Sequence, residues 1–225
     1  MRWSIRAGPV NWWLLSTCHE GRRTFDAAEF IRPAGPIRLR KQEVPRSRVT
    51  YIIVDFEATC SDRNEVPREE MEIIEIGAVA LWQNGPDLRG EFQSFVKPTR
   101  HPVLTDFCRR LTSITQKKVE AADPFPAVLE RFAAWIQSFD SPVFCSWGDY
   151  DRYQLQQDCA YHDVPYPFGE EHINIKTRFA GSLNLRKACG LEQALRRVGL
   201  PFEGTPHRGI DDARNMANLS GYLFF

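Results

Sequence analysis

Two acidic residues stand at the end of an apolar run in the first third of the chain. The run YIIVDF occupies residues 51–56, and Asp55 and Glu57 are two positions apart. On a strand this spacing places both carboxylates on one face, while Val54 and Phe56 face the other way. Two carboxylates at the end of a central strand are costly unless a cation matches their charge. An isolated Asp-x-Glu is more often the solvent-facing end of an edge strand. The pair indicates a cation site only if further acids occur at the ends of other elements.

A third acid follows the short apolar stretch at residues 142–147. Two aspartates occur there in the sequence Asp149-Tyr150-Asp151, and either of them can face inward. We prefer Asp149, because it follows the strand most closely and stands at a helix N-terminus, where an anion is favoured. Asp151 remains the alternative.

The fourth acid lies in the closing segment PHRGIDDARNMA, residues 206–217. A helix that begins near Ile210 turns by about 100° per residue, which places Asp212 at the border of the apolar side. The same geometry places Asp211 on the polar face, as a solvated or capping residue. We therefore expect Asp212 to be the site acid.

His207 precedes this helix and suits proton transfer. It lies about 140° from Asp212 on an ideal helix, so the two side chains cannot share one helical face. We expect His207 to stand on a mobile loop hinged at Gly209 and Asp212 to be fixed by the helix. Magnesium prefers oxygen ligands, which makes His207 a better general base than metal ligand. The alternative is an ordinary surface histidine. The presence of four acids at strand and helix ends favours the catalytic interpretation over this one.

The elements that must position these groups begin at residue 51. Apolar runs at 72–82 and 91–98 predict two further strands and, with the first, an antiparallel meander. Helical spacing of apolar residues covers 124–138. In the later part of the chain, residues 142–147 predict a short buried strand and a helix follows Asp149. Two further helices are predicted, one over residues 191–198 and one from residue 210. Strands in a meander, followed by strands alternating with helices, predict an α/β fold with a mixed sheet flanked by helices.

Length and composition favour one catalytic domain with an extension. The 225 residues allow one α/β domain at residues 49–225, preceded by an Arg-rich extension at residues 1–48 that we expect to be poorly ordered. A secretory leader around Trp12 is disfavoured, because Asn11 interrupts a very short apolar region and no A-x-A site follows. No run of about 18 apolar residues occurs, so we expect no membrane partner.

Charge and cysteine usage narrow the functional classes. The whole chain has 29 basic and 29 acidic residues, and residues 1–50 hold ten basic and four acidic ones. Their balance of +6 leaves −6 for residues 51–225, which does not fit a general nucleic-acid binder but fits a site that concentrates carboxylates for cations. The six cysteines show no CxxC, which argues against a zinc site or a disulfide framework. They fit the reducing cytosol, so we expect a cytoplasmic protein.

The order D-x-E, D, H-x-x-x-x-D resembles the DEDDh exonucleases of the RNase T and proofreading superfamily. Within it, the chain is most similar to the histone-mRNA and small-RNA 3′ exonuclease group and its bacterial KapD-like relatives. The similarity covers residues 51–224 and includes the stretches 104–129, 173–179 and 190–195. It implies a ribonuclease H-like fold with a five-stranded mixed sheet.

The resemblance also implies a mechanism, in which two Mg²⁺ or Mn²⁺ ions assist hydrolysis and nucleoside 5′-monophosphates leave the 3′ end. The acids that it assigns to the metals are Asp55, Glu57, Asp149 and Asp212, with His207 as general base and Glu57 counted among the catalytic groups. Gly148, between Trp147 and Asp149, departs from the family pattern, and Asp151 therefore remains the alternative third acid.

The expected partner is the 3′ end of single-stranded nucleic acid. Phe107 and Trp147 are candidates to stack on the terminal base, and Ala58 and Thr59 to contact the last nucleotide through the backbone, beside His207. Many DNA-proofreading members have Thr-Thr-Gly where this chain has Ala-Thr-Cys at residues 58–60, which favours RNA. The alternatives are a DNA-directed or editing exonuclease of the same fold and a non-catalytic binding module. The complete acid set argues against the module.

Overall fold

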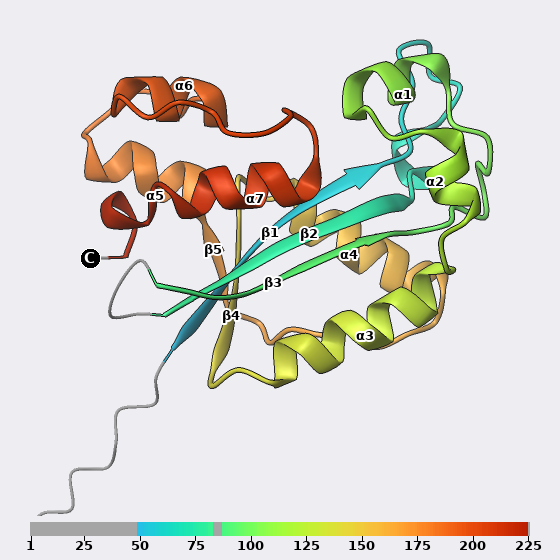
Figure 1. Ribbon diagram of the computed structural model, residues 1–225, viewed down its shortest axis with the longest axis horizontal. Helices are drawn as coiled ribbons and strands as arrows, with labels where there is room; N and C mark the ends of the chain where they lie inside the picture. The colour runs from blue at the N-terminus through green and yellow to red at the C-terminus, as the bar shows by residue number, and fades with distance from the viewer. Residues whose placement is uncertain (1–48, 83–86, 225) are drawn as a thin grey trace, which may run out of the picture. The chain divides into compact units, whose positions relative to one another are not determined.

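The computed structural model describes residues 49–82 and 87–224 (Figure 1). The expectation for the extension at residues 1–48 lies outside the described residues. Within the described ranges, no helix has the length and apolar character needed to cross a membrane.

A five-stranded mixed sheet forms the centre of the described part, in the order β3-β2-β1-β4-β5. Its strands are β1 (Thr50–Ala58), β2 (Ile73–Trp82), β3 (Leu88–Phe95), β4 (Pro142–Ser146) and β5 (His172–Asn174). β1, β2 and β3 pair antiparallel, whereas β4 runs parallel to β1 and β5 runs parallel to β4. The predicted mixed sheet with an antiparallel meander is therefore confirmed.

Seven α-helices and two short 3₁₀ turns accompany the sheet in the described residues. They are 3₁₀ turn η1 (Arg68–Glu70), α1 (Asp106–Thr112), α2 (Gln116–Glu120), α3 (Phe125–Gln137), α4 (Tyr150–Tyr161), α5 (Ile175–Ser182), α6 (Leu191–Arg197), α7 (Gly209–Ala217) and η2 (Ser220–Tyr222). Figure 1 shows α5, α6 and α7 on one side of the sheet and α3 and α4 on the other, with α1 and α2 near the end of β1.

Strand β1 is buried between these two helical layers. Its side chains alternate, so that Tyr51 and Ile53 pack with residues of α5, α6 and α7. Ile52, Val54 and Phe56 pack with residues of α3 and α4 on the opposite face. The alternation carries on to the end of the strand and directs Asp55 and Glu57 towards the layer that contains α7.

Candidate active site

Four acids and one histidine meet at the end of β1, in a cleft of about 370 Å³. Asp55 and Glu57 come from β1, Asp151 from the first turn of α4, and Asp212 from the first turn of α7. His207 stands in the turn before α7. Residues far apart in the chain thus supply one compact acidic site.

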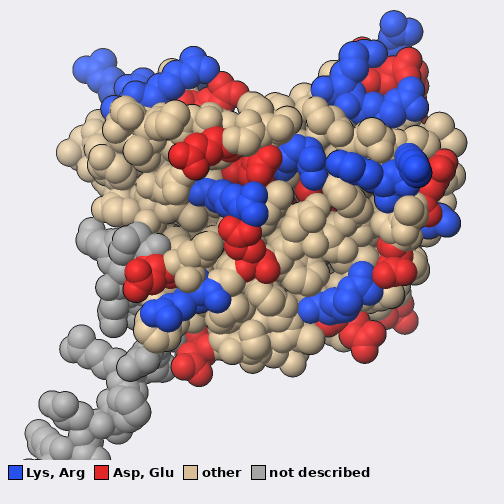
Figure 2. Space-filling model, in the orientation of Figure 1, with Lys and Arg blue, Asp and Glu red and all other residues tan. Residues whose placement is uncertain are grey.

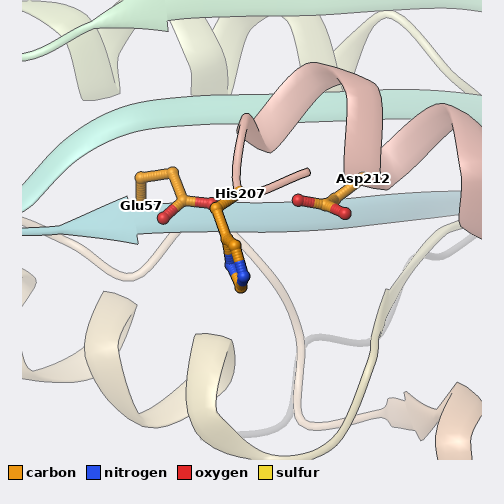
Figure 3. Close-up of side chains that lie close together, drawn as sticks. All are labelled: Glu57, His207 and Asp212. Atoms are coloured by element: carbon orange, nitrogen blue, oxygen red, sulfur yellow. The ribbon is translucent and has the colours of Figure 1, made fainter. Parts of the chain in front are cut away.

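Three of these side chains lie close enough to share one ion. One ligand atom each of Glu57, His207 and Asp212 lies within 4.8 Å of the other two. In Figure 3 the carboxylates of Glu57, from the strand, and Asp212, from the helix, lie on either side of His207.

The third acid of the site is Asp151, which corrects the preference for Asp149. The Asp149 side chain is 49% exposed; its Oδ2 accepts a hydrogen bond from Asn174 and its Oδ1 lies 3.6 Å from Nδ1 of His172. Asp151 is buried, and its Oδ1 accepts a hydrogen bond of 3.0 Å from the backbone N–H of Phe56.

The course of the chain after β4 explains this difference. The pairing of β1 with β4 ends at Ile53 of β1 and Cys145 of β4. Phe56 of β1 lies beyond this point, so β4 offers its backbone no partner. Gly148, at φ +112°, turns the chain, and α4 begins two residues later. The first turn of α4 then directs Asp151 back to β1, where it supplies the acceptor that a buried N–H requires.

The four acids hold a high concentration of negative charge. Burial, followed by the charges of Asp151 and Glu57, raises the pKa of Asp55 well above its usual range. Burial is also the main reason why the pKa of Glu57 rises to about 9, that of Asp212 to about 7 and that of Asp151 to about 6.

This acidic set fits a divalent cation. Among the described residues, no lysine or arginine forms an ion pair with any of the four acids. Closely placed carboxylates without a cationic partner favour protonation or a bound metal. Hard oxygen donors are the ligands that Mg²⁺ and Mn²⁺ prefer.

The helical geometry predicted for the two adjacent aspartates agrees with their positions. Asp212 is buried in the cleft. Asp211 accepts a 3.0 Å hydrogen bond from the backbone N–H of Thr205 and another from Arg214, so it ties down the turn that precedes α7. Asp211 therefore lies on the polar side of α7, as expected from the sequence, but it holds the preceding turn and does not cap the helix.

Gly209 is a point of close packing, which corrects its predicted role as a hinge. It is buried as the first residue of α7, and its φ is not positive. A Cβ at Gly209 would lie 2.8 Å from the carbonyl oxygen of Asp55, and a Cβ at Gly77 would lie 2.0 Å from the carbonyl carbon of Gly209. Two glycines therefore let the start of α7 touch the backbone of β1 and β2.

The predicted substrate contacts divide into two groups. Ala58 and Trp147 line the cleft, and the indole of Trp147 donates to the carbonyl of Cys189. Phe107 does not line the cleft and instead lines a separate groove. Thr59 does not line the cleft either: its N–H donates to the carbonyl of Glu72 and its hydroxyl accepts from the Glu72 N–H.

Sequence reasoning missed several apolar side chains in the cleft. They are Met71, Leu111, Tyr150 and Leu191. Tyr150 is 39% exposed and Leu111 36% exposed. Singly exposed apolar residues are common, so the relevant observation is that these side chains line the same cleft as the acids. In the sequence these residues are single apolar positions beside polar ones, so only the folded chain shows that they face a common space.

A model of the RNase T exonuclease family matches residues 52–220, which is most of the chain. The chain belongs to this exonuclease family. It is 33% identical over 196 residues to 3′-5′ exoribonuclease 1 of Rattus norvegicus, covering 82% of this chain and 56% of the relative. With ERI1 exoribonuclease 2 of Xenopus laevis it shares 31% identity over 204 residues, covering 80% of this chain and 29% of that one. The chain thus spans about half the length of the first relative and less of the second.

Solved structures of exonucleases share its fold. The nuclease domain of 3′hExo, described as a DEDDh family member bound to rAMP, superposes with a TM-score of 0.69 at 32% identity, covering 76% of this chain and 89% of that one. A 3′-exonuclease described in 3′-end specific recognition of a histone mRNA stem-loop gives 0.69 at 31% identity, with 77% and 80% covered. Exonuclease I, at 12% identity and 0.62, shares the fold alone, with 77% and 40% covered. The predicted DEDDh family and ribonuclease H-like fold are confirmed.

Proposed function

We propose that this exonuclease-family chain is a metal-dependent 3′–5′ exoribonuclease that releases nucleoside 5′-monophosphates. The observation that carries the proposal is the meeting of Asp55, Glu57, Asp151, Asp212 and His207 in one cleft. The names of its relatives, which are 3′-5′ exoribonucleases, and the rAMP bound to 3′hExo support it.

We expect the four acids to hold two Mg²⁺ or Mn²⁺ ions, which would lower the pKa of a bound water and stabilise charge on the scissile phosphate. Asp55 experiences the charges of the other three acids, so it stands at the centre of the set. Glu57 and Asp212 lie beside the histidine. Ions held by these acids would therefore place the scissile phosphate beside His207.

His207 is the general base of the proposed reaction. Its side chain is exposed at the cleft, so it can reach a water that enters from solvent. Its backbone is fixed by the start of α7, while a ring nitrogen lies near Glu57 and Asp212. A base within reach of the attacking water contributes about 10²–10⁴-fold to the rate.

The apolar side chains of the cleft suit the terminal nucleoside. Leu111 of α1 and Tyr150 of α4 present exposed apolar surface to it, and Trp147 and Leu191 complete the lining. Stacking of a base on an aromatic ring is worth about 1–3 kcal/mol and tolerates any sequence. We expect these four residues to hold the last base, with Ala58 leaving room for the sugar.

Basic side chains on both sides of the cleft suit the phosphates upstream. Figure 2 shows Lys and Arg side chains gathered over two raised ends of this face, with a hollow between them. Figure 1 places α1 and α6 at these two ends, and the exposed basic residues of these helices include Arg109 and Arg110 on α1 and Arg196 on α6. Such charges bind a backbone independently of sequence.

The free cysteines support a reducing compartment. The described residues contain five unpaired cysteines, namely Cys60, Cys108, Cys145, Cys159 and Cys189. We therefore keep the cytoplasm as the proposed location.

The test is digestion of 5′-labelled single-stranded RNA and DNA of equal sequence with Mg²⁺ or Mn²⁺. We expect a ladder that shortens from the 3′ end, and faster loss of RNA, because the 2′-OH distinguishes the two polymers. Cuts at internal positions would contradict the exonuclease assignment. Equal rates on both polymers would remove the RNA preference, and faster loss of DNA would favour a DNA-directed or editing enzyme.

A further inference from the structure

A fifth buried acid, Glu75, lies next to the four acids of the cleft. It is fully buried on β2, directly opposite Glu57 in the antiparallel pairing. Its carboxylate accepts hydrogen bonds of 2.9 Å from both Nε and Nη2 of Arg208, one of 2.9 Å from Gln93, and one of 3.3 Å from the backbone N–H of Gly209. Glu75 is therefore saturated with donors and is not part of the open acid set.

Arg208 is the residue directly after His207, so its side chain ties the histidine turn to the sheet. The Arg208 side chain is only 17% exposed, and its guanidinium lies 5.2 Å from the centre of the Phe95 ring. A two-pronged arginine–carboxylate bond fixes orientation as well as distance. Together with the Gly209 N–H, it fixes the backbone immediately after His207 to β2.

The chain before His207 is held separately. Asp211 accepts from Thr205, and Gly204 at φ +88° brings the backbone against the Asp211 carboxylate. His207 itself has φ +60°, a conformation that side-chain-bearing residues seldom adopt. Such a conformation persists only where the surroundings impose it.

We propose that Glu75 and Arg208 are positioning residues for the general base, holding the His207 turn so that its imidazole faces Glu57 and Asp212. The proposal rests on the proposed exonuclease function. Neither residue lines the cleft, so neither is expected to touch the substrate. The pair acts through the backbone that carries His207.

The first test compares Arg208→Met with Arg214→Met. Arg214 is a matched control, because it lies on α7, which Arg208 directly precedes, and makes the same two-pronged bond to Glu91 of β3, but its side chain is 48% exposed and does not line the cleft. It also donates to Oδ1 of Asp211, but the bond from Thr205 goes to Oδ2 and remains when Arg214 is replaced. A displacement of about 1 Å at a reacting group can cost about 10²-fold. We expect Arg208→Met to lower kcat on single-stranded RNA by about 10–100-fold with KM changed less than about threefold, and Arg214→Met to leave both nearly unchanged.

Two further variants separate positioning from a general loss of folding. Arg208→Lys keeps a positive charge beside Glu75 but cannot form both bonds, so we expect a smaller loss of kcat in the same direction. Arg208→Ala should regain activity when about 10 mM ethylguanidinium is added, because the ligand can refill the space beside Glu75. Equal losses of kcat in Arg208→Met and Arg214→Met, or no rescue by ethylguanidinium, would overturn the proposal.

Hydrogen exchange tests the proposal without any turnover. In the metal-free protein, Arg208→Met should speed amide exchange in residues 205–209, while the rise of Tm on adding Mn²⁺ stays as in the parent. Unchanged amide exchange would overturn the positioning role. Loss of the Tm rise with Mn²⁺ would also overturn it, because the substitution would then have damaged the acid set and not only the His207 turn. If the parent does not degrade RNA, the proposed function fails, and the exchange result still decides whether the pair holds the turn.

Discussion

At the scale of single residues, Asp149 and Asp151 form a natural test pair. Asp151→Asn removes an acid that lies in the cleft, whereas Asp149→Asn changes an exposed side chain outside it. We expect Asp151→Asn to lower kcat by at least about 100-fold, in the range found when one preorganised charge-stabilising group is removed from an active site. Asp149→Asn should keep activity within about threefold. Single-turnover digestion of labelled RNA measures both, and the reverse order would restore the assignment made from the sequence.

At the scale of elements, the contact between α7 and the sheet depends on glycine. Gly77→Ala would force a Cβ to within 2.0 Å of the Gly209 backbone, so β2 and α7 must separate. Overpacking of this kind typically costs about 1–3 kcal/mol, and here no flexible side chain can give way. We expect at least that loss in urea unfolding, together with loss of activity, because Asp212 and His207 move with the helix.

Gly181→Ala is the matched control for this change. Gly181 lies within α5, and a Cβ there would meet no atom within 4 Å. Alanine in a helix interior is favoured over glycine by about 0.5–1 kcal/mol, and the gain should be smaller at Gly181, the second-last residue of α5. We therefore expect Gly181→Ala to raise the free energy of unfolding slightly and to leave activity unchanged. A Gly77→Ala protein as stable as Gly181→Ala would show that α7 does not pack on β2 in this way.

At the scale of the whole molecule, the buried acids link stability to pH and to metal. Asp151, Asp212 and Glu57, with pKa values raised to about 6, 7 and 9, hold protons in the folded state that the unfolded chain has already lost. Their contribution to stability is full below the unfolded carboxylate pKa of about 4 and is lost as the pH rises through the folded values.

A divalent cation should reverse this loss. It binds the deprotonated acids, so the gain in Tm on replacing EDTA with Mn²⁺ should increase between pH 5.5 and 8. At free metal of about 100 times the dissociation constant, the stabilisation is about 2.7 kcal/mol, or roughly 5–11 °C at about 2–4 °C per kcal/mol.

In EDTA, Asp55→Asn should be at least as stable as the parent, because one of the repelling charges is gone.

The pH dependence of Tm in EDTA alone does not isolate the acids, because two histidines change the stability in the opposite direction. The difference in Tm between Mn²⁺ and EDTA at each pH isolates the metal site. Burial lowers the pKa of His162 and His172, so their contribution to stability grows as the pH rises through the unfolded value of about 6.5. A metal effect that is the same at both ends of the pH range would contradict a shared metal site.

Residues 1–48 allow a further prediction at this scale. The first 50 residues carry ten basic and four acidic side chains, so we expect a weak, salt-sensitive attraction to RNA. Deletion of residues 1–48 should raise KM at low salt, have less effect at high salt, and leave kcat nearly unchanged. Steady-state kinetics at two salt concentrations measure this. Loss of turnover or folding would instead make the segment part of the catalytic domain.

The sequence by itself determined which residues share a face within one element. The two-residue period of β1 directed Asp55 and Glu57 to one side, and the turn of about 100° per residue separated Asp212 from Asp211. Both results hold in the structure, because such orientations follow from the local backbone geometry of a strand or a helix.

Only the tertiary structure decided which elements meet and where. Asp151 reaches the site because β4 ends early and Gly148 turns the chain back to β1. Gly209 touches β2 instead of bending, and Arg208 finds Glu75, a residue 133 positions away. These contacts depend on strand register, helix placement and the distance between backbones, and no period within a single element carries that information.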